Sequence, residues 1–216
     1  AALYKHADLY TLKSGVKIWS FETDDQIRSS PARAGNKVIF GCDDGFVYAV
    51  SYDSGKLLWK YETKGAVIAN PVIDIKNNLV LIGSSDFNFY ALDLENGNLL
   101  WEYGTDGQIL NGGALSKDKI IFSSNDKKLY CLNSKTGKKI WIIQSEAVIG
   151  TSPLIAGDYV YWGSLNHHLY AAQFENGNIE WKYKTKGRVR TTPVIWGNYL
   201  VVASEDDHIY TFIPDK

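Results

Sequence analysis

Short apolar segments separated by turn residues run along the whole chain. Between residues 69 and 103 the apolar positions form four segments, at residues 69–73, 79–82, 89–92 and 99–103, each rich in Val, Ile, Leu, Tyr or Trp. Gly, Asn, Asp or Pro lies between them. Such composition is typical of strands joined by tight turns, and no helical stripe of useful length is present. The pattern therefore predicts an all-β chain of short strands.

The four-strand pattern recurs about every 40 residues. Five tryptophans lie 40, 42, 40 and 40 residues apart, and a glycine precedes each by four positions. The tryptophans are Trp19, Trp59, Trp101, Trp141 and Trp181, and the glycines are Gly15, Gly55, Gly97, Gly137 and Gly177. Strand-rich repeats of this length are typical of propeller blades, because one repeat buries its faces only by stacking on its neighbours. The predicted unit is a four-stranded antiparallel blade of a β-propeller.

The repeated glycine and tryptophan have separate predicted roles. Each glycine falls in the hairpin between the third and fourth strands, where a positive φ is wanted. Each tryptophan falls in the fourth strand, at the wide outer edge of a blade, where its ring can fill the space between sheets and its indole N–H can reach a backbone oxygen. A ligand cage would not need the residue in all five copies. The five tryptophans are therefore predicted to be structural docking residues.

Each copy has a tyrosine in its predicted third strand, and in the complete copies an acidic or amide residue lies four positions before it. These residues are Asp44, Asp86, Asp126, Asn166 and Asp206. Their repetition predicts a structural role, since Asp and Asn cap tight turns by accepting hydrogen bonds from nearby amides. The histidine pair His167 and His168 cannot easily share a metal, because adjacent strand residues point to opposite faces. The sequence predicts no metal site.

The segment Gly83–Trp101 carries glycine, serine, aspartate, tyrosine and tryptophan at offsets that several copies share. It resembles the repeat of the pyrroloquinoline quinone (PQQ)-like propeller family, and the resemblance covers essentially the whole chain. It implies a propeller and an extracytoplasmic location, periplasmic or secreted. The family includes quinoprotein dehydrogenases, the scaffold lipoprotein of outer-membrane protein assembly, and sensor or adhesion modules that bind no quinone. Fold alone does not choose among these activities.

A quinoprotein of this family would need particular residues to hold its quinone. The resemblance implies a quinone held between a tryptophan and a disulfide of adjacent cysteines, with calcium bound in long insertions. The two cysteines here are Cys42 and Cys131, and every copy is close to minimal length. We therefore expect no cofactor, PQQ included.

The copies predict a single propeller domain over residues 1–216. The first four repeats span about 24–63, 64–105, 106–145 and 146–185, and the last joins 186–216 to 1–23. In that last blade the Trp19 strand lies beside the Tyr210 strand, which closes a five-bladed ring with strands from both termini.

An open array is the alternative, because third-strand segments occur at both Tyr10 and Tyr210. The chain would then be an arc or fragment of a propeller with seven or eight blades, as the family resemblance implies. A closed ring is expected to be monomeric. An open arc exposes apolar blade faces and is expected to self-associate.

Charge and hydropathy exclude two classes of partner. The chain has 23 basic and 24 acidic residues and a pI near 6.5, so it lacks the positive field that attracts nucleic acid. No apolar run reaches the roughly 18–20 residues that span a bilayer. We expect neither nucleic-acid binding nor a membrane span.

Candidate binding residues lie where each fourth strand leads into the next blade. Arg28, Arg188 and Arg190 come from the first and last blades, which are neighbours in a closed ring, and guanidinium groups bind carboxylate or phosphate bidentately. The alternative is that they pair with acids on the same face. A polar collar lies beside them: Ser29, Asn111, Thr151 and Thr191. The alternative role of the collar is to satisfy backbone groups and channel water.

The leading functional prediction is a noncatalytic propeller that binds a protein or a small anionic ligand, as a scaffold or sensor module. The first alternative is a quinoprotein-type or carbohydrate-active enzyme. No catalytic triad, paired-carboxylate site or phosphate-binding loop is evident, although acids could pair across a channel without leaving a sequence trace. The second alternative is a minimal or fragment propeller of mainly structural role.

Overall fold

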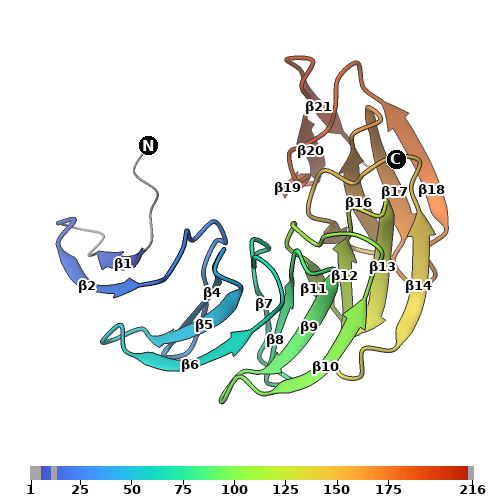
Figure 1. Cartoon of the computed structure of the whole chain (residues 1–216). Helices are drawn as coiled ribbons and strands as arrows, with labels where there is room; N and C mark the ends of the chain where they lie inside the picture. Colours follow the sequence, from blue (N-terminus) through green and yellow to red (C-terminus); the bar gives the residue numbers. More distant parts are fainter. Residues whose placement is uncertain (1–5, 11–13, 214–216) are drawn as a thin grey trace. The chain divides into compact units, whose positions relative to one another are not determined.

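The computed structural model describes residues 6–10 and 14–213. All regular structure in these ranges is β-strand, arranged in six antiparallel sheets. The chain divides into two compact units, residues 1–110 and 111–216, each with three sheets (Figure 1). The predicted all-β fold of mostly four-stranded antiparallel blades is confirmed.

The first unit contains a two-stranded sheet followed by two four-stranded sheets, each a meander in chain order. The two-stranded sheet consists of β1 (His6–Tyr10) and β2 (Lys17–Glu22). The next consists of β3 (Ala32–Ala34), β4 (Lys37–Gly41), β5 (Phe46–Ser51) and β6 (Leu57–Glu62). The third consists of β7 (Val72–Asp74), β8 (Leu79–Gly83), β9 (Asn88–Asp93) and β10 (Leu99–Gly104).

The second unit contains two four-stranded sheets followed by a three-stranded sheet. The first consists of β11 (Ala114–Ser116), β12 (Lys119–Ser123), β13 (Lys128–Asn133) and β14 (Lys139–Gln144). The second consists of β15 (Leu154–Ala156), β16 (Tyr159–Ser164), β17 (His168–Gln173) and β18 (Ile179–Lys184). The last consists of β19 (Val194–Trp196), β20 (Tyr199–Ala203) and β21 (Ile209–Phe212).

The first strand of each four-stranded blade is shorter than the sequence pattern predicts. The predicted segment 69–73 becomes β7, which begins only at Val72. Pro71 directly precedes it, and proline has no N–H to give to a strand ladder. The apolar residue Ala69 is nevertheless buried, so it belongs to the core without belonging to a strand.

Strand alternation divides the side chains of a blade between two neighbours. On one face of β16, Val160 packs in a cluster with Ile121 and Leu129 of the preceding sheet. On the other face, Tyr161 packs with Leu200 and Val202 of the following sheet. Because the side-chain period is two, a single strand thus contributes to two inter-sheet cores.

Tryptophan links one sheet to the next by a hydrogen bond as well as by packing. The Trp59 Nε1–H donates to the Leu94 carbonyl oxygen at 3.1 Å, and the Trp141 Nε1–H donates to that of Phe174 at 3.1 Å. Trp19 makes the same bond to Tyr52 at 2.7 Å. In all three cases the acceptor lies just before the glycine hairpin of the following sheet.

The hairpin glycine lies beneath the tryptophan of the preceding sheet. A Cβ on Gly97 would lie 2.6 Å from a ring carbon of Trp59, and a Cβ on Gly177 would lie 2.9 Å from a ring carbon of Trp141. Both glycines also have positive φ, 75° and 76°. The position therefore excludes other residues twice, by backbone conformation and by contact with the indole ring.

The repeated acid before each tyrosine caps its turn, as the sequence predicts, and also anchors the tyrosine. Asp86 Oδ1 accepts the Asn88 amide at 3.0 Å. Its Oδ2 accepts the Tyr90 hydroxyl at 2.7 Å and the Lys64 amide at 2.8 Å. Burial, together with the hydrogen bond to Asp86, raises the pKa of Tyr90 well above its ordinary value, so the hydroxyl stays a donor. One carboxylate thus joins a turn, a strand and the loop from the preceding blade.

Removal of this hydroxyl should weaken the blade. We expect Tyr90→Phe to lower the free energy of unfolding by about 1–2 kcal/mol, because the half-buried carboxylate of Asp86 loses one donor. Urea denaturation followed by circular dichroism measures the change. Tyr52→Phe is the control, since the Tyr52 hydroxyl has no hydrogen bond to any described residue. An equal effect of the two changes would contradict the anchoring role.

The predicted ring closure is wrong at the level of strand pairing. Strand β2 pairs with β1, with Leu9 opposite Trp19, and β21 pairs with β20 alone, so no sheet contains both ends of the described chain. Strand β1 therefore takes the place that the prediction gave to the Tyr210 strand. The β1–β2 connection closes a short loop, which costs less entropy than pairing residues nearly the whole chain apart. The sequence pattern predicts the third-strand segment at Tyr10 over residues 9–12, of which residues 11 and 12 lie outside the described residues.

Candidate functional site

The last sheet exposes an apolar face. Register places Val194 opposite Val201, Trp196 opposite Tyr199, and Ile209 opposite Ala203 on this face. Trp196 is 74% exposed and Ile209 is 73% exposed. The opposite face of the same sheet is packed, because Leu200 and Val202 are buried against Tyr161. We call the side that carries Val194, Trp196 and Ile209 the uncovered face.

An open space lies beside Trp181, at the edge of the same sheet. Trp181 stacks on Phe212, with ring centroids 5.4 Å apart, and is half-buried. A pocket of about 440 Å³ is lined by both rings together with Tyr161, Leu200 and Ile213. At the corresponding place, Trp59 and Trp141 contact a hairpin glycine of the next sheet. No described glycine hairpin lies beneath Trp181.

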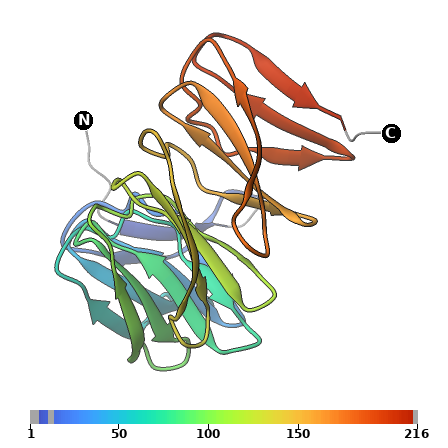
Figure 2. The same cartoon turned by 90° about the vertical axis from the view of Figure 1, so that its right-hand side faces the viewer.

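Strand β21 is a free edge. In each complete blade the third strand pairs with a fourth, as β17 does with β18. Strand β21 pairs only with β20, so one side of its backbone has no ladder partner among residues 6–10 and 14–213. The last sheet, red in Figure 2, therefore combines a free edge with the uncovered face. Such an edge is a template for an added strand.

The three arginines of the predicted patch lie in different units and two of them pair with acids. The Arg28 Nε lies 2.7 Å from Asp43 Oδ2, and the Arg190 Nε lies 2.8 Å from Glu205 Oε1. Arg188 is exposed, and its carbonyl oxygen accepts the Glu205 amide. These pairs correspond to the alternative role predicted for the arginines, with Asp43 and Glu205 as the acids. A joint anion site remains a prediction.

The polar collar bonds mainly to the backbone. Thr151 Oγ1 accepts the Gly163 amide at 3.0 Å, and Thr191 Oγ1 accepts that of Ala203 at 3.1 Å. Ser29 Oγ lies 3.4 Å from the Ser30 carbonyl oxygen. Asn111 Nδ2 lies 3.4 Å from Ser123 Oγ and from the Ile149 carbonyl oxygen. The collar thus fixes loops in place, and its predicted role in ligand binding stays a prediction.

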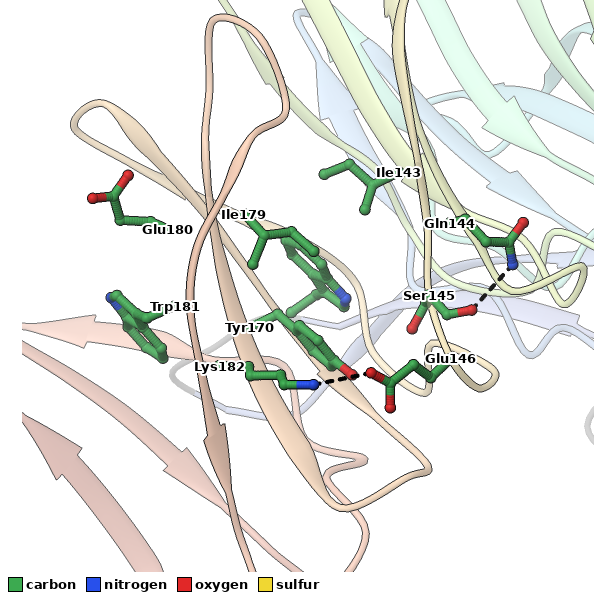
Figure 3. Close-up of a pocket in the computed structure, with 10 residues that line it drawn as sticks. Ile143, Gln144, Ser145, Glu146, Tyr170, Ile179, Glu180, Trp181 and Lys182 are labelled. Carbon is green, nitrogen blue, oxygen red and sulfur yellow. Dashed lines mark hydrogen bonds and ion pairs between the residues drawn. The ribbon is translucent and has the colours of Figure 1, made fainter.

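A second pocket lies inside the second unit, between the β11–β14 and β15–β18 sheets. It has a volume of about 330 Å³. Figure 3 shows Tyr170 of β17, Lys182 of β18 and Glu146 of the loop after β14 close together. Ile143 and Ile179 supply apolar surface. We call this space the inter-blade pocket.

Two buried polar atoms belong to residues that line the inter-blade pocket. Trp162 Nε1 and Ser145 Oγ have no hydrogen-bond partner among the described residues. Trp162 is fully buried and stacks on Tyr170, with centroids 5.2 Å apart and an interplanar angle of 5°. At the mouth, Lys182 Nζ lies 3.0 Å from Glu146 Oε1. The hydrogen bond from Lys182 lowers the pKa of Glu146, and the same contact raises the pKa of Lys182, so this pair is charged at neutral pH.

Comparison with known proteins now identifies the repeat. Residues 125–215 match a family model described as outer membrane protein assembly factor BamB. The sheets are blades of a PQQ-like propeller. A search of curated proteins finds no match.

Two solved structures share this PQQ-like propeller fold. The computationally designed Ika8 protein has a TM-score of 0.85 and 16% identity, over 96% of this chain and 64% of its own. BamB from Moraxella catarrhalis has a TM-score of 0.60 and 20% identity, over 96% of this chain and 78% of its own. The chain thus spans less than two thirds of the designed protein. At these identities the likeness establishes the fold alone.

The cysteines do not fit the quinone site that PQQ-like dehydrogenases would need. Both are free and buried: Cys42 directly follows β4 in the first unit, and Cys131 lies in β13 of the second. Cys42 Sγ contacts the carbonyl oxygens of Asp25 and Gln26. Burial raises the pKa of the Cys131 thiol to about 12, which keeps it protonated and unreactive. Neither cysteine has the neighbouring thiol that the sandwich requires.

The described ranges contain neither a cluster of metal-ligating side chains nor a long apolar helix. Nowhere in them do three His, Cys, Asp or Glu side chains gather in a way that could hold a metal ion. Nothing helical in them has the length and hydropathy that a membrane crossing requires.

Sequence reasoning missed the inter-blade pocket, and it anticipated exposed apolar blade faces only in the open-array alternative, without placing one on the last sheet. The pocket had a readable signal, because Ser145 replaces the threonine of four other copies, at positions 23, 63, 105 and 185. Asn166 likewise replaces the repeated aspartate. The uncovered face had no such signal, because its residues have the same pattern as internal blades.

Proposed function

We propose that this chain is a noncatalytic PQQ-like propeller that binds a protein partner by accepting a β-strand at β21. The observation that carries the proposal is Trp181, which has an open pocket where other docking tryptophans meet a glycine hairpin. A partner segment with the Gly-x-x-x-Trp pattern would pair with β21 and place its glycine beneath Trp181. Strand addition of this kind takes affinity from backbone bonds and specificity from side-chain pockets.

The uncovered face supports the same function. Large exposed apolar patches mark interaction sites, and Trp196 and Ile209 are of the apolar kind that anchors interfaces. The matched family model, which describes an assembly factor, also favours a scaffold.

A strand peptide tests the proposal directly. The peptide has the sequence of residues 15–24, which contains Gly15 and Trp19, and carries a fluorescent label. We expect it to bind the full chain with a Kd on the order of 10–100 μM, measured by fluorescence anisotropy. A peptide with alanine in place of Gly15 should bind at least about tenfold more weakly, because its Cβ would meet Trp181.

Variants of the chain locate the site. Ile209→Asp on the uncovered face should abolish binding, whereas Ile75→Asp should not, since Ile75 is an equally exposed residue in a turn of another sheet. Light scattering shows whether a second copy of the chain supplies the strand. The proposal fails if the peptide does not bind, or if Ile209→Asp binds it normally.

A further inference from the structure

One copy of the repeat departs from the others at three positions that converge on the inter-blade pocket. Trp162 stands where the other complete or partial blades have Phe40, Ile82, Phe122 and Val202, each opposite the repeated tyrosine. None of those side chains carries an N–H. Only here does the stack on the tyrosine add a buried hydrogen-bond donor.

Ser145 is the second departure. The threonines at the equivalent positions donate to the carbonyl oxygen two residues on, as Thr63 does to Gly65 at 2.7 Å and Thr185 to Gly187 at 2.6 Å. The Ser145 hydroxyl is buried and makes no such bond. The change removes a methyl group and leaves a polar group unengaged at the pocket wall.

Asn166 is the third departure, and it contacts Glu146. In other copies the tyrosine hydroxyl donates to an aspartate, but here Asn166 Nδ2 donates to the Tyr170 hydroxyl oxygen at 2.9 Å. The Tyr170 hydroxyl therefore keeps its own proton for another acceptor. Asn166 Nδ2 also donates to Glu146 Oε2 at 3.2 Å, which fixes the carboxylate at the pocket mouth.

These groups define the chemistry that the pocket selects. The Trp162 indole, the Ser145 hydroxyl and the Tyr170 hydroxyl are donors, and an unsatisfied buried donor is costly unless something accepts from it. Ile143, Ile179 and Trp181 provide apolar walls. Two carboxylates, Glu146 and Glu180, and one ammonium group, Lys182, line the pocket, so its charge disfavours an anion, and Glu146 can accept an N–H. A volume of about 330 Å³ suits a small ring compound.

We propose that the inter-blade pocket binds a small neutral aromatic amide. The carbonyl oxygen accepts from Trp162 and Ser145, the amide N–H donates to Glu146, and the ring lies against the isoleucines. This site shares Trp181 with the pocket at which the partner strand would dock, but its polar groups come from Ser145, Trp162, Tyr170 and Glu146 and none belongs to β21.

Nuclear magnetic resonance of the full chain labelled with ¹⁵N at its tryptophan indoles tests the proposal, with benzamide as the probe. The chain has seven tryptophans, and Trp162→Phe identifies the Trp162 signal by removing it. Benzamide should shift that signal with a Kd on the order of 1 mM. Toluene lacks the acceptor and benzoate carries a charge, so both should bind at least about tenfold more weakly.

Substitutions separate recognition from simple cavity filling. Ser145→Thr restores the residue of the other copies and should weaken benzamide binding about tenfold or more, because the hydroxyl regains its carbonyl partner and the methyl group fills space. Thr63→Ser, the same exchange in reverse in the first unit, should leave binding unchanged. An unshifted Trp162 signal at roughly 20 mM benzamide, or an equal response to toluene, would overturn the proposal.

Discussion

Replacement of Gly97 by alanine should destabilise the chain by about 3–5 kcal/mol, because two penalties add. The φ of Gly97 is 75°, where an L-residue with a Cβ is strained. The added Cβ would also lie 2.6 Å from a ring carbon of Trp59, and that ring cannot withdraw without losing the Nε1 bond to Leu94. Urea denaturation followed by circular dichroism measures the loss.

Gly157 separates the two penalties. Its φ is 59°, and a Cβ there would meet no atom within 4 Å. Gly157→Ala should therefore cost only the backbone term, about 1 kcal/mol. If Gly97→Ala and Gly157→Ala lowered the free energy of unfolding equally, the contact with Trp59 would have no energetic role.

The sequence was sufficient for the repeat unit because the signals of a blade are local. Turn residues bound each strand, and the turn cap at Asp86 and the hairpin at Gly97 lie within a few residues of the strands that they join. The start of β7 was misplaced for an equally local reason, since Pro71 interrupts the ladder inside a continuous apolar segment. Local patterns therefore predicted the elements and the docking tryptophans, with small errors at strand ends.

Relations between distant residues could not be predicted in the same way. The contact between Gly97 and Trp59 joins one hairpin to the strand of another blade, and a spacing within one repeat does not reveal it. The prediction of ring closure failed because β1 pairs with β2 in place of the Tyr210 strand. Both segments have the third-strand pattern, and the pattern does not show which of them binds β2 more strongly. The acids Asp43 and Glu205, which pair with Arg28 and Arg190, were missed because they lie one residue before the position that repeats.

Comparison of the repeat copies with one another could have indicated the inter-blade pocket. A repeat supplies its own internal comparison, so a residue such as Ser145 or Asn166 that breaks the pattern points to a local demand. Three such departures at one place, with Trp162 as the third, are more informative than any one of them alone. The sequence shows the departures, but only the structure shows that they meet, because residues 145–146, 162 and 166 come from different strands and loops.

Trp59→Ala should also have a large effect and lower the free energy of unfolding by about 3–5 kcal/mol. The change leaves a cavity at a buried site and removes an inter-sheet hydrogen bond. The matched control is Trp181→Ala, which should cost less, since Trp181 is only half-buried and borders an open pocket. Circular dichroism during thermal unfolding should show a lower Tm for Trp59→Ala than for Trp181→Ala.

The double variant Gly97→Ala with Trp59→Ala decides whether the two residues act as a unit. With the ring gone, the new methyl group meets no indole, so Gly97→Ala should add only the backbone term of about 1 kcal/mol. The two single losses should therefore fail to add by about 2 kcal/mol or more. Additive losses would mean that the glycine is required by its φ alone. In that case Trp59 would join the two sheets without any contribution from its contact with Gly97.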